Sequence, residues 1–170
     1  MNHLWSPWRM TYITMNKNET VCILCFVLSL TDGDENLVVH RGELAYVLMN
    51  RYPYTSGHLM VVPVEHVSTL GDLTSQARAE IMELTSQALS VLTEVYHPQG
   101  FNLGMNLGEA AGAGIAEHLH MHIVPRWIGD TNFMLTTAST RVLPEALEDT
   151  YLRIKEAWQR FARSGTTEAS

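Results

Sequence analysis

Three histidines stand at every second position in the stretch EHLHMHIVPRW, which runs from residue 117 to residue 127. His118, His120 and His122 alternate there with apolar residues. Successive side chains of a β-strand point to opposite faces, so a strand would place the three imidazoles on one face and the apolar side chains on the other. A lone histidine is usually an ordinary core or surface residue. Three in strict alternation predict a chemical site on one face and a hydrophobic core on the other.

Two kinds of chemistry fit three neighbouring imidazoles. They can bind a metal, since imidazole is a common ligand of zinc and iron. Alternatively, one histidine is a nucleophile, and the others orient it and bind phosphate. The spacing alone leaves both open. The Asp-His pair or the downstream glutamate that usually completes a metallo-hydrolase or cupin-like metal site is missing from the residues that follow, IVPRW.

A second chemical pattern is formed by Cys22 and Cys25, the only two cysteines of the chain. Their C-x-x-C spacing in a reducing cytosol indicates metal or redox chemistry more than a structural disulfide. A thioredoxin-like redox pair is disfavoured because no βαβ pattern follows it. A structural zinc needs four ligands, so two further residues would have to join the cysteines.

Composition limits the classes of protein to which the chain can belong. Its 170 residues fit one domain, with residues 1–20 as an N-terminal arm and 163–170 as a flexible tail. Hydrophobic residues make up 46%, enough for a core, yet no apolar run approaches the ~18 residues of a membrane span. No signal-peptide pattern opens the chain, so we expect a soluble, cytoplasmic protein. The net charge of -7, without a Lys/Arg cluster, disfavours nucleic acid as a partner.

Short strands joined by turns must position these residues. The sequence predicts strands at residues 37–40, 44–50, 58–64, 101–107 and 118–125, and helices at 74–96 and from Pro144 onwards. Apolar residues recur at spacings of three and four in both helices, and Pro144 suits a first helical turn. Because hairpin-like connections dominate, we expect an α+β fold, a mainly antiparallel sheet with two helices packed on one face.

These residues together resemble the histidine triad family. The signature of that family is His-φ-His-φ-His-φ-φ, where φ is apolar, and residues 118–124 match it completely. A glycine-containing loop precedes the triad, and NRYPYTSGHLMVVP is similar to the second signature, with Asn50 eight residues before His58. The resemblance covers about residues 20 to 160. The segments LWSPWRMTYI and HIVPRW look closest to the bacterial branch that acts on diadenosine tetraphosphate.

The resemblance implies a covalent mechanism. His120, the middle histidine, would attack the α-phosphorus of a nucleotide and form a nucleotidyl-histidine intermediate, which divides one displacement into two. His122 would donate a hydrogen bond to phosphate oxygens, and His58 would join the same cluster. The backbone carbonyl of His118 would hold the tautomer of His120.

The resemblance also implies how a nucleotide, with adenine nucleotides as the expected class, would be bound. Asn50 would bond the ribose hydroxyls, and Asn106 would face the phosphates or the leaving group. Backbone N–H groups around Gly112, Gly114 and Ile115 would surround the phosphate, because glycines let the backbone come close.

The loop before the triad departs from many family members, which carry amide and hydroxyl side chains where this chain has Gly114 and Ile115. This departure leaves the acceptor open: water would give hydrolysis and inorganic phosphate would give phosphorolysis. Two alternatives to cleavage of dinucleoside polyphosphates stay open. One is hydrolysis of nucleoside phosphoramidates, and the other is a non-catalytic module that binds zinc and nucleotide.

Finally, the resemblance implies a structural zinc held by Cys22, Cys25, His66 and His118. His118 would then serve the metal, and His120 and His122 the chemistry. Members of the family are usually homodimers, and we expect the same here.

Overall fold

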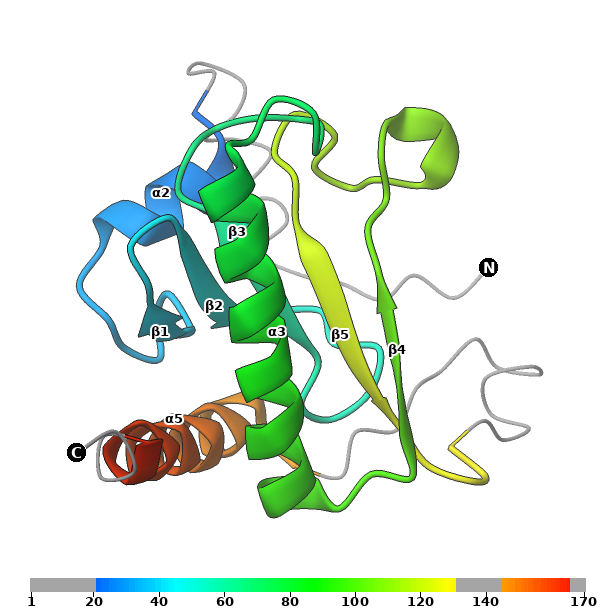
Figure 1. The fold of residues 1–170 in the computed structure, drawn as a ribbon. Helices are drawn as coiled ribbons and strands as arrows, with labels where there is room; N and C mark the ends of the chain where they lie inside the picture. Colours follow the sequence, from blue (N-terminus) through cyan, green and yellow to red (C-terminus); the bar gives the residue numbers. More distant parts are fainter. Residues whose placement is uncertain (1–20, 131–144, 166–170) are drawn as a thin grey trace.

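The computed structural model describes residues 21–130 and 145–165 (Figure 1). A five-stranded sheet in the order β1-β2-β3-β5-β4 forms its centre. The strands are β1 (Val38–Arg41), β2 (Ala45–Met49), β3 (Leu59–Pro63), β4 (Gly100–Gly104) and β5 (Met121–Arg126). Each pair of neighbours in this order is antiparallel, so the predicted α+β fold with an antiparallel sheet is confirmed.

Helices cover both faces of the sheet, not one as predicted. The two predicted helices, α3 (Ser75–Tyr96) and α5 (Leu147–Gly165), lie on one face, and a third helix, α2 (Ile23–Ser29), packs on the other (Figure 1). A helix of seven residues is too short for a clear periodicity, which is why the sequence did not reveal it. The face towards α3 and α5 buries Val39, Ala45, Val47, Met49, Leu59, Val61 and Ile123, and the face towards α2 buries Val38, Tyr46, Leu48, Met60 and Val62.

The two long helices follow the sequence pattern closely. The side chain of Thr74 accepts a hydrogen bond of 3.1 Å from the backbone N–H of Ala77, which caps the start of α3. Helix α5 continues through Gly165, into the segment predicted as a tail. Pro144 and the predicted N-terminal arm lie outside the described residues. Within the described chain, no helix combines the length and the apolar composition needed to cross a bilayer.

The segment around the triad forms less strand than predicted. Strand β4 already ends at Gly104, and β5 begins only at Met121, so His118 and His120 precede the strand. The reason lies in the hydrogen bonding of the backbone, since the N–H of Leu119 donates to the carbonyl of Val67, at 2.7 Å, in the loop after β3. The first half of the triad is therefore held by a loop.

We predict that Gly57→Ala destabilises the protein, because Gly57 has a positive φ of 75° and packs against α3. An added Cβ would lie 3.0 Å from Cδ2 of Leu92 and 3.3 Å from the ring of Tyr96. Backbone strain and overpacking together should lower the free energy of unfolding by about 1–3 kcal/mol, measured by urea denaturation. Gly33→Ala is the control, since nothing lies within 4 Å of its added Cβ. Equal stability of the two variants would contradict the prediction.

Candidate functional site

Three imidazoles meet where β3 and β5 lie side by side. His58 directly precedes β3, and the pairing of Met60 with His122 sets the register between the two strands. Nε2 of His58 lies 3.0 Å from Nδ1 of His122. The rings of His120 and His122 meet edge to face, with centroids 4.8 Å apart. Three histidines from two distant parts of the sequence thus form one cluster, hereafter the histidine cluster.

The apolar residues between the histidines face the opposite way. Leu119 and Ile123 are buried in the core beneath α3, and Met121 packs against that core. This confirms the predicted alternation, although the regular strand begins only at Met121.

Hydrogen bonds determine the tautomers of His58 and His122. The backbone N–H of Tyr54 donates to Nδ1 of His58 at 3.1 Å. Because Nδ1 of His58 accepts, the proton of the neutral ring is on Nε2, and this N–H donates to Nδ1 of His122. His122, when neutral, therefore carries its own proton on Nε2. This directed chain leaves His122 with an N–H group able to donate to a ligand.

His120 has the opposite tautomer. Its Nδ1 lies 2.8 Å from the carbonyl oxygen of His118, and a carbonyl only accepts, so the proton of His120 is on Nδ1. The contact that the resemblance implied is thus present. Nε2 of His120 then carries a lone pair, and the residue is buried, with 6% of its surface exposed to solvent. The cluster consequently combines a potential nucleophile on His120 with an N–H donor on His122.

Burial keeps His122 neutral. Loss of solvation lowers the pKa of His122 from 6.5 to about 4, and repulsion by a charged His120 contributes in the same direction. A neutral His122 preserves the directed hydrogen-bond chain at physiological pH.

The low pKa of His122 predicts that the protein loses stability as the pH falls from 6.5 towards 4. In that window the unfolded chain binds a proton at this histidine and the folded chain does not, so this contribution to stability is complete only above pH 6.5. His122→Gln should therefore show a smaller drop in the free energy of unfolding between pH 7 and pH 5 than the wild type does, in urea titrations. An equal drop in both proteins would refute the assignment.

The predicted nucleotide-binding residues lie on segments that lead into the cluster. Asn50 directly follows β2, and its side-chain oxygen accepts the backbone N–H of Tyr52 at 2.9 Å, which directs its NH₂ group to serve as the donor. Asn106 follows β4 and is half-buried. Gly112 has a φ of 83° and ends the short 3₁₀ helix η1 (Glu109–Ala111).

The same loop then continues through Gly114, which is exposed, to Ile115. The side chain of Ile115 packs against the hydrophobic cluster on the α2 face and so anchors the end of the loop. Sequence reasoning missed Tyr54 and Thr55, which also belong to the site. Their place inside NRYPYTSGH, the motif that contributes Asn50 and His58, was the available signal.

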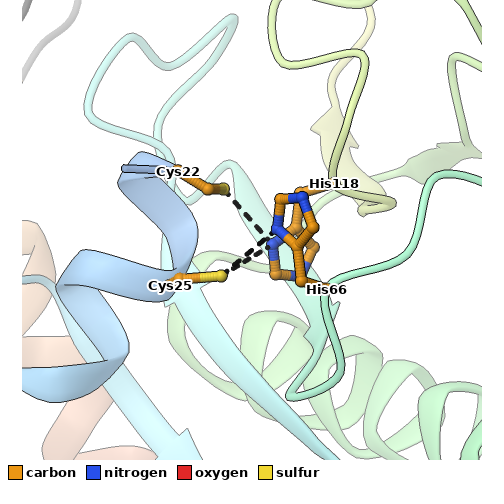
Figure 2. Close-up of side chains that lie close together, drawn as sticks. All are labelled: Cys22, Cys25, His66 and His118. Carbon is orange, nitrogen blue, oxygen red and sulfur yellow. Dashed lines mark hydrogen bonds between the residues drawn. The ribbon is translucent and has the colours of Figure 1, made fainter. Parts of the chain in front are cut away.

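A second cluster joins α2 to the start of the triad (Figure 2). The ligand atoms of Cys22, Cys25, His66 and His118 all lie within 4.8 Å of one another. Cys22 Sγ lies 3.4 Å from Nδ1 of His118, and Cys25 Sγ lies 3.3 Å from Nδ1 of His66. A tetrahedral zinc with bonds of about 2.0–2.3 Å separates its ligand atoms by roughly 3.3–3.8 Å. The four residues are therefore close enough to bind a metal ion.

The tautomer of His118 fits a metal ligand. Its Nε2 lies 2.9 Å from the carbonyl oxygen of Pro63 and must donate to it, so Nδ1 presents a lone pair to the two thiols. Burial raises the pKa of the Cys22 thiol, so a metal ion that binds there has to displace its proton. His118 thus connects the two clusters, since its ring faces the cysteines and its carbonyl holds His120.

Hydrogen bonds from the sheet side of the molecule hold the cysteine-bearing helix α2. Its backbone carbonyls accept hydrogen bonds from Tyr46 Oη at Leu24 (2.8 Å), from Asn36 Nδ2 at Val27 (3.1 Å) and from Arg41 at Leu28 and Leu30 (2.6 and 2.8 Å). These bonds come from β1, β2 and the loop before them. The backbone next to the thiols is therefore attached to the sheet by hydrogen bonds that do not involve the thiols.

Comparisons with known proteins identify relatives of this chain. The sequence model of the HIT domain matches residues 33–127. A Mycobacterium tuberculosis protein named AP-4-A phosphorylase is 42% identical over 167 residues, which cover 94% of this chain and 86% of that protein. The asymmetrical bis(5′-nucleosyl)-tetraphosphatase of Schizosaccharomyces pombe is 30% identical over 89 residues, 52% of this chain and 48% of that one. A zinc-bound histidine triad family protein from Mycobacterium smegmatis has a TM-score of 0.67 at 24% identity, with 84% of this chain and 96% of that chain covered.

Proposed function

Because this chain belongs to the histidine triad, or HIT domain, family, we propose that it cleaves dinucleoside polyphosphates such as diadenosine tetraphosphate. The observation that carries the proposal is the pairing of opposite tautomers in the histidine cluster, with a lone pair on Nε2 of His120 and an N–H on Nε2 of His122. A nucleophile beside a donor suits attack on phosphorus, where negative charge develops on the phosphate oxygens. The name of the Mycobacterium tuberculosis relative supports the choice of substrate.

In the first step, Nε2 of His120 attacks the α-phosphorus, an N–P bond forms, and the bond from phosphorus to the bridging oxygen breaks. The leaving nucleotide carries the bridging oxygen away, and the nucleotidyl group stays on His120. The Nε2–H of His122 donates to a phosphate oxygen and compensates its charge. The NH₂ group of Asn50 donates to a ribose hydroxyl, and the backbone around Gly112, Gly114 and Ile115 binds the phosphates, with Asn106 towards the leaving group.

In the second step, an acceptor attacks the nucleotidyl-histidine and restores His120. Inorganic phosphate as the acceptor converts diadenosine tetraphosphate into ATP and ADP, whereas water gives ATP and AMP. The name of the phosphorylase relative supports phosphate as the acceptor, and the name of the tetraphosphatase relative supports water. The higher identity and coverage of the phosphorylase lead us to propose phosphate.

Product analysis tests the proposal. Purified protein receives diadenosine tetraphosphate with and without inorganic phosphate, and anion-exchange chromatography resolves the products. ATP and ADP formed only with phosphate would support phosphorolysis, and ATP and AMP formed in both samples would identify a hydrolase. No turnover in either sample would reject dinucleoside polyphosphates as substrates. An adenosine phosphoramidate assayed in parallel would then test the alternative in the same family.

We further propose that Cys22, Cys25, His66 and His118 hold a structural zinc ion. Bound there, zinc would crosslink α2 to the start of the triad and contribute stability, and the transfer of the nucleotidyl group would not use it. A homodimer and a cytoplasmic location remain predictions. Analytical ultracentrifugation of the purified protein tests the first of these.

A further inference from the structure

The ring of Tyr54 covers two members of the histidine cluster. Its centroid lies 4.6 Å from that of His58, at an interplanar angle of 41°, and 6.0 Å from that of His122, at 27°. The tyrosine is 46% exposed, so the ring stands between these imidazoles and solvent. One side chain therefore contacts both rings of the directed hydrogen-bond chain.

Hydrogen bonds fix the backbone that carries this ring. The N–H of Tyr54 donates to Nδ1 of His58, and the N–H of His58 donates back to the carbonyl of Thr55 at 3.2 Å. The hydroxyl of Thr55 donates to the carbonyl of Pro125 in β5 at 2.9 Å, which ties the loop to the strand that carries His122. The position of Tyr54 is thus set relative to both histidines that it covers.

We propose that Tyr54 is a positioning residue, whose ring holds His58 and His122 in the orientation that places the proton of His122 on Nε2. Its consequence for turnover rests on the function proposed above, but its effect on the imidazoles does not. Water that reached the rings would compete as both donor and acceptor for their nitrogens, and either ring could then turn about χ2 and lose the hydrogen bond between them.

The other groups around His122 do not replace the tyrosine ring. His120 meets His122 edge to face, and His58 donates to it in a tilted arrangement, so neither stacks on its face. Of these three neighbours, Tyr54 has the smallest interplanar angle to His122, so its ring is the one that stacks on that imidazole. Cover by this ring also agrees with the loss of solvation that lowers the pKa of His122.

Three variants separate positioning from simple bulk. Tyr54→Phe keeps the ring, Tyr54→Leu keeps an apolar side chain without a ring, and Tyr54→Ala removes both. With diadenosine tetraphosphate, the leucine and alanine variants should lose about three- to tenfold in kcat, the effect expected for one aromatic pair, with little change in KM. The phenylalanine variant should restore the rate to within about twofold of the wild type.

The decisive readout is the ¹⁵N spectrum of the imidazoles, which reports the protonated nitrogen without substrate. His122 should give the Nε2–H tautomer in the wild type and in Tyr54→Phe, and a mixture of tautomers in Tyr54→Leu and Tyr54→Ala. Unchanged spectra in the last two variants, with thermal unfolding showing that they are folded, would overturn the proposal. A wild type that turns over no dinucleotide would refute the proposed function, and the spectra would still decide the role of Tyr54.

Discussion

Replacing His120 by asparagine should abolish turnover of diadenosine tetraphosphate while nucleotide binding persists. The asparagine amide is similar in reach and can still donate to the carbonyl of His118, which the Nδ1–H of the histidine contacts at 2.8 Å. It has no nucleophilic nitrogen, so no nucleotidyl intermediate can form. We expect kcat to fall at least about 10³-fold, equivalent to about 4 kcal/mol of transition-state stabilisation. Initial rates measure this loss, and isothermal titration with ADP measures the binding that remains.

A matched control uses the same substitution outside the histidine cluster. His97 is exposed and ends α3 in the left-handed conformation, with a φ of 46°, which asparagine adopts readily. His97→Asn should therefore keep the wild-type rate and stability. If His120→Asn retained the wild-type rate as well, His120 could not be the nucleophile, and the proposed mechanism would fail.

Removal of the metal ion should lower the stability of the protein much more than it lowers the rate of turnover. A ligand present at about a thousand times its dissociation constant contributes about 4 kcal/mol to the free energy of unfolding, so chelation of zinc should reduce stability by about this amount. The anchored helix α2 should remain folded, because Asn36, Arg41 and Tyr46 bond its carbonyls without the metal. Below the melting temperature, metal-free protein should still form products.

Metal analysis and thermal unfolding with and without chelator test this prediction. His66→Ala removes the most exposed of the four ligands, and it should lower both zinc content and melting temperature. His97→Ala, which alters a histidine outside the metal cluster, should leave the zinc content unchanged. Metal-free protein of wild-type stability would refute a structural zinc. Loss of all activity without loss of folding would instead indicate that the metal takes part in the reaction.

Local periodicity was enough to predict several elements and two candidate sites. Alternation of histidines with apolar residues predicted two faces, because a strand repeats every second residue. The spacing of apolar residues predicted α3 to within one residue at its start. The C-x-x-C spacing and the triad signature identified candidates for two sites, and the resemblance supplied their division between metal and chemistry.

The three-dimensional arrangement was needed to establish which ring nitrogens His58, His118 and His122 present. The position of each proton depends on backbone groups that hydrogen-bond to the ring, and the folded chain brings these groups to the histidines. The carbonyl of Pro63 turns Nδ1 of His118 towards the cysteines, and the N–H of Tyr54 fixes the proton of His58 on Nε2. The contact of His120 with the carbonyl of His118, in contrast, was already implied by the family resemblance. The three-dimensional arrangement was needed for α2 as well, because its seven residues are too few to form a stable helix alone and depend on bonds from β1, β2 and the preceding loop. Sequence reasoning missed Tyr54 because its role arises from stacking on His122, which lies 68 positions further along the chain.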